Sequence, residues 1–236
     1  EGVGHYEPLR HYAEVHLLMS PGEPGTGIQV LADCSEDLLA RNWQRLIMTH
    51  VEEREHRGVL TGSVLTDVKI TLVAGKAHLK HTEGGDFRQS TYRAIRQGLR
   101  KAQAAGHAVL LEPIYTFRLE VPTENIGRAM ADMQRLGAEY EGPETAGTHS
   151  VITGHGPVAT LKDYSREVAA YTHGHGRFLA SMAGDGPCHN QEEVIAASGY
   201  DENVYTSNTC TGVINTLKGG CWTKEDGATE YITLHG

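Results

Sequence analysis

The sequence predicts an α+β protein made of two α/β sandwich domains. Extended segments rich in β-branched residues alternate with amphipathic helical segments, which is typical of mixed α+β folds. The chain has 236 residues, enough for two domains that each have a packed core. Its 39% apolar and 22% charged residues separate it from disordered proteins. We expect one domain at residues 1–112 and a second at 113–200, and we leave 201–236 as an unassigned extension.

The first half opens with extended segments. Residues 7–19 are strand-like, a turn-rich connection holds Pro21, Gly22 and Pro24, and residues 26–32 are extended again. The first segment starts without a capping or leader sequence before it. We therefore expect the chain to be cut from a longer protein.

A helix is predicted next. Leu39 and Trp43 begin an apolar repeat at the three- and four-residue spacing of one helical face. Ser35 or Asp37 is placed to cap the start of this helix, and Gly58 is placed to stop it.

A strand, a loop and a second helix follow. Residues 65–73 alternate and favour β-branching, which predicts a half-buried strand. Residues 78–85 are polar and end in two glycines, so they predict an exposed loop. Residues 88–101 predict a helix with an apolar face at Tyr92, Ile95 and Leu99. Three basic residues of this helix lie within about 60° of one another and predict a basic ridge: Arg93, Arg96 and Arg100.

The second half predicts a ferredoxin-like βαββαβ sandwich. This order requires residues 149–160 to form a hairpin bent at Gly154 and Gly156. The predicted segments are a strand at 115–121, a helix at 125–139, the bent stretch at 149–160, a helix at 161–171 and a strand at 177–183.

Cysteine usage and hydropathy predict a cytoplasmic protein. The four cysteines, Cys34, Cys188, Cys210 and Cys221, have no CxxC spacing, which argues against a disulfide scaffold or a zinc ribbon. Cys210 and Cys221 could pair, but free thiols are expected in a reducing cell. No run of eighteen apolar residues and no secretory leader are present, so we expect no membrane partner.

The charge is unevenly distributed. The net charge is −9, yet residues 41–118 carry thirteen Lys and Arg against seven Asp and Glu, a local balance of +6. Because electrostatic fields are screened beyond about 8 Å at physiological salt, such a region can approach nucleic acid on an acidic protein. The alternative is an ordinary solvated helical face.

No catalytic residue and no metal site are predicted. The sequence lacks a GxxxxGK[ST] phosphate loop, a dinucleotide-binding fingerprint, a GxSxG elbow and an HExxH helix. Candidate ligand pairs lack the spacing of known metal sites: His173 with His175, Cys188 with His189, and His78 with His81. A small metal- or ligand-binding enzyme that uses these histidines remains the alternative function. A protein-interaction module that presents a sheet edge is a third reading.

Several ordered segments indicate a family. Residues 66–75, the Asp86-Phe87 helix start, residues 110–113 and residues 121–128 resemble the fourth and fifth domains of elongation factor G in order and spacing. Three features resemble the tetracycline-resistance ribosomal protection proteins of that GTPase family more closely: Trp43, Gly84-Gly-Asp-Phe-Arg88 and Cys188-His-Asn-Gln-Glu-Glu193. The resemblance covers about residues 3–201.

The resemblance implies a fold and a partner. The first domain would have the βαβ fold of domain IV, of the ribosomal protein S5 domain 2-like class, with its first residues coming from the end of domain III. The second would have the ferredoxin-like fold of domain V. The partner would be the ribosome and not DNA, with the domain-IV tip at the 16S rRNA decoding centre and domain V near the GTPase-associated region of the large subunit. GTP and Mg would belong to the G domain of the parent, so neither GTPase activity nor a cofactor is expected of this chain.

The resemblance also implies the binding residues. His78 lies where elongation factor G has a tip histidine, and histidine rings, lysine and glycine suit contact with folded RNA. The tip of the ribosomal protection proteins bears serine and proline, whereas residues 79–83 read Leu-Lys-His-Thr-Glu. Tetracycline resistance, translocation and rescue of stalled ribosomes therefore stay open as roles. The expected rRNA-binding residues are His78, Leu79, Lys80, His81, Thr82, Glu83, Gly84 and Gly85 in the tip loop, and Arg88, Arg93, Arg96 and Arg100 on the next helix.

Overall fold

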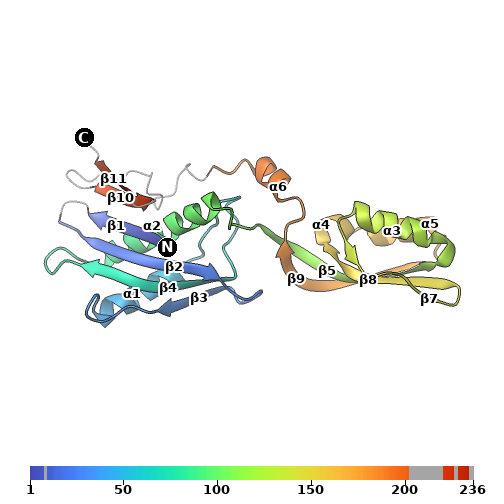
Figure 1. Cartoon of the computed structure of the whole chain (residues 1–236), viewed down its shortest axis with the longest axis horizontal. Helices are drawn as coiled ribbons and strands as arrows, with labels where there is room; N and C mark the ends of the chain where they lie inside the picture. Colours follow the sequence, from blue (N-terminus) through green and yellow to red (C-terminus); the bar gives the residue numbers. More distant parts are fainter. Residues whose placement is uncertain (8–9, 202–219, 226–227, 234–236) are drawn as a thin grey trace. The chain divides into compact units, whose positions relative to one another are not determined.

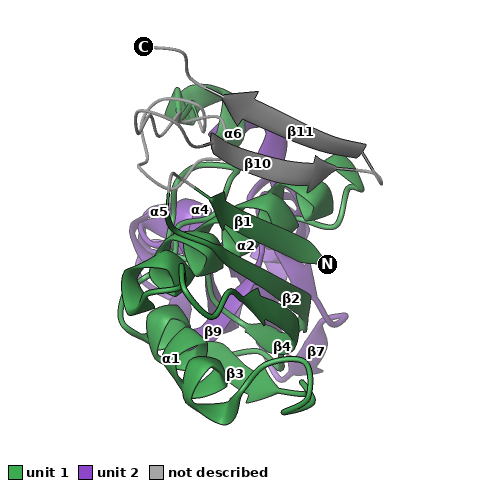
Figure 2. Cartoon of the chain, turned by 90° about the vertical axis from the view of Figure 1, so that its left-hand side faces the viewer, with its two compact units in different colours: residues 1–108, 195–236 green, residues 109–194 purple. Residues whose placement is uncertain are grey.

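The computed structural model describes residues 1–7, 10–201, 220–225 and 228–233. The chain forms two compact units, coloured separately in Figure 2. Unit 1 comprises residues 1–108 and 195–236, and unit 2 comprises residues 109–194. The expected boundaries at 112 and 200 lie four and six residues away from these.

Unit 1 is built on a sheet in the order β11-β10-β1-β2-β4-β3. Strands β3 and β4 are parallel, and every other neighbouring pair is antiparallel. The strands are β1 (Gly2–Glu7), β2 (Ala13–Pro21), β3 (Ile28–Ala32), β4 (Val68–Ala77), β10 (Gly220–Glu225) and β11 (Ala228–Thr233).

Two helices cover one face of this sheet. Helix α1 (Arg41–Glu52) connects the parallel strands β3 and β4, and α2 (Gly84–Ala104) follows β4 and lies against β1 and β2 (Figure 1). Alternate residues of β2 and β4 point toward the helices and are buried, because the side-chain period of a strand is two. The buried core of unit 1 is Ala13, Val15, Leu17, Leu39, Ile47, Val51, Ile70, Leu72, Phe87, Ala94 and Ile95.

Close packing of α2 on β1 depends on two glycines. A Cβ atom at Gly2 would lie 2.0 Å from the carbonyl oxygen of Ala94, and one at Gly4 would lie 1.8 Å from that of Ser90. No side chain fits there, so the helix backbone lies directly against the strand.

Unit 2 has a four-strand order of β6-β8-β5-β9, with β7 also paired to β8. Along the chain, α3 lies between β5 and β6, and α4 and α5 lie between β8 and β9. This is the ferredoxin-like arrangement, so the predicted α+β class and the predicted sandwich are confirmed. Its elements are β5 (Leu111–Pro122), η1 (Thr123–Asn125), α3 (Ile126–Arg135), β6 (Glu139–Tyr140), β7 (Glu144–Ala146), β8 (His149–Pro157), α4 (Val158–Leu161), α5 (Tyr164–Tyr171) and β9 (Arg177–Pro187), followed by α6 (Gln191–Ser198) across the unit boundary.

The predicted hairpin at residues 149–160 is wrong. Residues His149–Pro157 form the single strand β8, and its hairpin partners are β6 and β7. Gly154 and Gly156 do not bend the chain: a Cβ at Gly154 would lie 2.2 Å from the carbonyl oxygen of Glu139, and one at Gly156 would lie 2.6 Å from the side chain of Leu161. They are glycines because neighbouring elements pass close to the strand.

Helix boundaries in unit 1 also differ from the predictions. Helix α1 begins at Arg41, and neither Ser35 nor Asp37 caps it, because Ser35 instead closes a turn by accepting the amide of Leu38 over 3.1 Å. Helix α2 begins at Gly84, so this glycine and Gly85 lie in its first turn and not in the loop.

The expected strand at residues 7–19 is two strands. Strand β1 ends at Glu7 and β2 begins at Ala13, so the chain reverses between them. Of the expected extension, residues 202–219, which include Cys210, lie outside the described residues, whereas β10 and β11 extend the sheet beside β1. Within the described part of the chain, no helix combines the length and the apolar character that membrane spanning needs.

Candidate nucleic-acid interface

The loop between β4 and α2 lies at the surface of unit 1. His78, Leu79 and Lys80 are exposed, and Leu79 is fully so. His81 and Thr82 are half-buried, because they contact the rest of the unit. The structure thus has the exposed loop that the sequence predicts.

The turn between β1 and β2 braces this loop. The amide of Tyr12 donates to the carbonyl oxygen of His81 over 2.8 Å. The hydroxyl of Thr82 donates to the carbonyl oxygen of Tyr12 over 2.6 Å and accepts from the amide of His78, also over 2.6 Å. These hydrogen bonds join the β4–α2 loop to the β1–β2 turn and hold the loop in a defined shape.

Aromatic rings gather at the loop. The rings of His78 and His81 stack with centroids 4.5 Å apart and planes 24° apart, and the ring of Tyr12 lies 6.5 Å from that of His78. The ammonium of Lys76 lies 5.8 Å from the Tyr12 ring centre, within cation–π range. Burial and the nearby charge of Glu14 raise the pKa of Tyr12 to about 12, so its phenol stays protonated at neutral pH. We call Tyr12, Lys76, His78, Lys80 and His81 the tip cluster.

The start of α2 fixes the other end of the loop. Asp86 is buried, and one of its carboxylate oxygens accepts from the amide of Glu83 over 2.8 Å. The other oxygen lies 2.8 Å from Nδ1 of His11, which comes from the β1–β2 turn. An acidic side chain in the first turn is favourable there because the helix N-terminus is electropositive.

Arg88 is paired with a carboxylate, although half of its side chain stays exposed. Its Nε and one terminal nitrogen bind the carboxylate of Glu53 over 2.9 and 3.3 Å. Tyr92 also donates to this carboxylate, and His50 lies 3.2 Å from it. Burial acts to raise the pKa of Glu53, but these donors outweigh it and lower the pKa to about 2.

The exposed arginine ridge predicted on this helix is wrong at Arg93 and Arg96. Arg93 is fully buried, with its guanidinium 5.2 Å from the Tyr6 ring centre and donating to the Gln89 carbonyl over 2.9 Å. Arg96 is buried and donates to the hydroxyl of Tyr200 over 3.3 Å, and Arg100 is half-buried. Helical periodicity places these arginines together, but neighbouring segments cover the face that they share.

A basic depression beside α2 was not predicted. Arg54 and Arg57, which follow the end of α1, line it together with Arg96. Arg54 lies over the ring of Tyr92, 4.8 Å from its centre, and Arg57 donates to the carbonyl of Gly62 over 2.8 Å. In the sequence, Arg54 and Arg57 alternate with Glu52, Glu53 and Glu55, so the local charge balance does not indicate a basic cluster.

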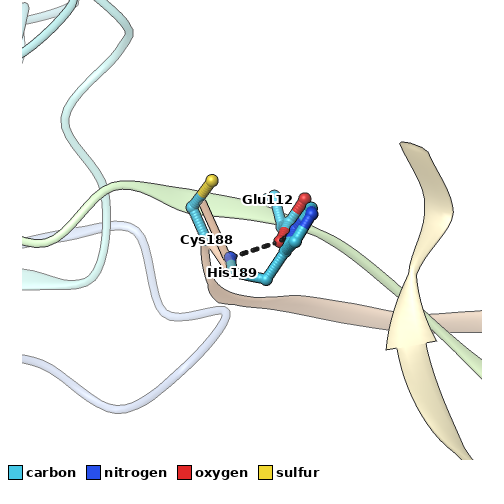
Figure 3. A group of neighbouring side chains, drawn as sticks. All are labelled: Glu112, Cys188 and His189. Carbon is cyan, nitrogen blue, oxygen red and sulfur yellow. Dashed lines mark hydrogen bonds and ion pairs between the residues drawn. The ribbon is translucent and has the colours of Figure 1, made fainter. Parts of the chain in front are cut away.

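Three potential metal ligands meet in unit 2. Figure 3 shows Glu112 at the start of β5 beside Cys188 and His189, which follow β9. Among the described residues this is the only group of three or more such side chains whose ligand atoms come within 4.8 Å of one another. Among the described residues, no third potential ligand lies near the pair His173 and His175 or near the pair His78 and His81.

Comparison with known proteins identifies the class that these two folds define. Residues 4–103 match the family "Elongation factor G, domain IV", and residues 109–194 match the family "Elongation factor G C-terminus". The chain belongs to the elongation factor G-like family, and both matches are to C-terminal domains of that factor. The predicted family is thereby confirmed.

Individual relatives agree. The chain is 32% identical over 173 residues to the tetracycline resistance protein TetP of Clostridium perfringens, which covers 73% of this chain and 26% of TetP. A crystal structure of a protein from Thermus thermophilus has the same fold, with a TM-score of 0.67 at 21% identity over 85% of this chain and 30% of that one. The chain thus spans less than a third of each relative.

Proposed function

We propose that this chain is the ribosome-binding C-terminal part of a translational GTPase, and that the tip cluster contacts rRNA of the small-subunit decoding centre. In this proposal GTP and Mg bind to a G domain elsewhere in the parent protein, the second unit lies near the GTPase-associated region of the large subunit, and the protein acts in the cytoplasm. The relatives and the two domain families support the class of protein.

One observation carries the placement of the contact. Stackable rings and two lysines gather at an exposed loop and the adjoining end of β4, and the β1–β2 turn braces the backbone of the loop. Proteins recognise folded RNA through stacking on unpaired bases and through cations placed at phosphates. A braced loop presents both without a large ordering cost.

Binding to purified ribosomes at several salt concentrations tests the proposal. Lys80→Ala combined with His81→Ala is expected to weaken binding about tenfold and to flatten the salt dependence, by about one unit of slope for the lost lysine. Arg41→Ala removes an exposed cation of unit 1 that is not part of the tip cluster and serves as the control, with little change expected. Equal binding by the tip variant and the wild type would refute the tip assignment.

The name of the Clostridium relative adds a narrower proposal for the whole protein, protection of ribosomes from tetracycline. Expression of the complete reading frame in a sensitive bacterium is expected to raise the inhibitory concentration of the drug. Unchanged sensitivity, with ribosome binding intact, would reject drug protection alone and leave the class of protein standing.

A further inference from the structure

We propose that Glu112, Cys188 and His189 bind a zinc ion in unit 2. The three side chains come from two segments that lie far apart in the sequence, and the fold brings them together because β5 and β9 are neighbouring antiparallel strands. Their carboxylate, thiol and imidazole ligand atoms lie within 4.8 Å of one another (Figure 3).

The donor set selects the metal. Carboxylate alone would suit calcium or magnesium, but a thiol beside an imidazole favours a borderline-soft ion such as zinc. Three protein ligands fill three corners of a tetrahedron, and water would supply the fourth. Tetrahedral ligation places ligand atoms roughly 3.5 Å apart, so small side-chain rotations suffice to complete the site.

The surroundings hold these ligands in place. The amide of His189 donates to an oxygen of Glu112 over 2.7 Å, and Nδ1 of the same histidine lies 2.7 Å from that oxygen. The thiol of Cys188 lies 3.5 Å from the amide oxygen of Asn190, whose nitrogen donates to Glu193 over 3.0 Å. Asn190 and Glu193 lie outside the ligand set, and outer partners of this kind orient metal ligands. The contact between Nδ1 of His189 and Glu112 joins two of the ligands and would be replaced by their bonds to zinc. On binding zinc, the thiol would release its proton to solvent.

A zinc ion bound at these three residues would stabilise unit 2, because the ligands come from both ends of the unit. Glu112 lies near the start of unit 2 and the other two ligands near its end. The amide of Cys188 already donates to the carbonyl of Leu110 over 2.8 Å, so the two segments are in register. A zinc ion there would join the chain's entry into the unit to its exit, and would stabilise the unit by closing that loop.

Titration of the metal-free, untagged full chain with zinc tests the proposal. We expect one zinc per chain with a dissociation constant of about 1 μM or below, and a higher melting temperature in its presence. Cobalt in place of zinc should give the near-ultraviolet band of a cobalt–thiolate bond together with the intense visible bands of a four-coordinate ion.

Variants separate this site from adventitious binding by the other histidines. Cys188→Ser and His189→Ala should each weaken binding about 100-fold, and Glu112→Gln about tenfold. Cys34→Ser and His107→Ala change another free cysteine and an exposed histidine of unit 1, and should bind as the wild type does. The absence of a cobalt–thiolate band in the wild type, or tight zinc binding that survives Cys188→Ser, would overturn the proposal.

Discussion

Thr82 is a single residue on which the shape of the tip depends. Its hydroxyl accepts a hydrogen bond from the amide of His78 and donates one to the carbonyl of Tyr12, and so links the loop to the β1–β2 turn. Valine has nearly the same shape and lacks the hydroxyl. Its substitution therefore isolates the brace from the bulk of the residue.

Thr82→Val is expected to lower the free energy of unfolding by about 1 kcal/mol, because both hydrogen bonds of the Thr82 hydroxyl are lost. It should also weaken ribosome binding several-fold, since the loop would have to be ordered on binding. Denaturant unfolding and ribosome binding measure the two effects. Thr71→Val, on β4 away from the tip, is the control. Unchanged ribosome binding in Thr82→Val would show that the brace does not matter for the contact.

A second residue-scale feature is a group of alternating acids and histidines on β1 and β2, in which His5 is buried and Glu14 and His16 are part-buried. Glu14 lies between His5 and His16, at 3.2 and 2.8 Å. Its hydrogen bonds with His16 and then His5 lower the pKa of Glu14, while Glu14 raises the pKa of His16.

This network predicts a pH-dependent stability. The lowered pKa of Glu14 stabilises the fold above its ordinary value of 4.5, and the benefit is lost as the pH falls through the folded-state pKa. The raised pKa of His16 stabilises the fold below 6.5, and the benefit is lost as the pH rises through its folded-state pKa. Glu14→Gln should therefore lower the free energy of unfolding most, by about 1 kcal/mol, between pH 4.5 and pH 6.5. Urea unfolding across the pH range measures it, with Glu124→Gln as an exposed control. A cost that does not vary with pH would contradict the assignment.

At the scale of elements, α2 is held on β1 by direct contact of backbones. Gly4→Ala is expected to destabilise unit 1 by about 3 kcal/mol, because the new methyl group would overlap the carbonyl oxygen of Ser90. Gly85→Ala in the first turn of the same helix meets no atom within 4 Å and should be neutral or slightly stabilising. Thermal unfolding measures both. Equal stability of the two variants would contradict the close packing.

Element-scale features also show where sequence patterns suffice. Alternation along β4 and the apolar face of α2 are dictated by burial against one layer, so local periodicity predicts both. The prediction of a hairpin at 149–160 was wrong because Gly154 leaves room for the neighbouring strand β6 and does not form a turn. That neighbour is known only from the order of the strands in the sheet. The prediction of an exposed arginine ridge was wrong for a similar reason, because the ring of Tyr6 on β1 lies against the guanidinium of Arg93.

The candidate sites divide in the same way. His78 and Lys80 were predicted because an exposed loop is a local property. Tyr12 and Glu112 were not, because each joins its site through pairing of segments distant in the sequence. No spacing rule within one segment contains that information.

At the scale of the whole molecule, the two units have separate cores. The buried cluster of unit 2 draws all its members from residues 117–168, and that of unit 1 from residues 13–95. Each unit therefore has the apolar interior that independent folding needs.

Residues 109–194 alone are expected to fold with a cooperative thermal transition. Ile152→Ala should lower the stability of this isolated unit by about 3 kcal/mol, since Ile152 is fully buried in its core. The same loss is expected for the corresponding transition of the full chain. Circular dichroism and calorimetry measure these transitions, and a non-cooperative melt of the isolated unit would contradict the separation of the cores.

Directed cleavage of rRNA tests the central claim most directly. An iron chelate would be attached to Leu79→Cys, in a chain whose four native cysteines are serine, because this position is fully exposed at the tip. Bound to the ribosome, the probe is expected to cut 16S rRNA at the decoding centre, whereas the same probe on Ala146→Cys of β7 should not. Ribosome binding without cleavage at the decoding centre by the Leu79→Cys probe would contradict the account.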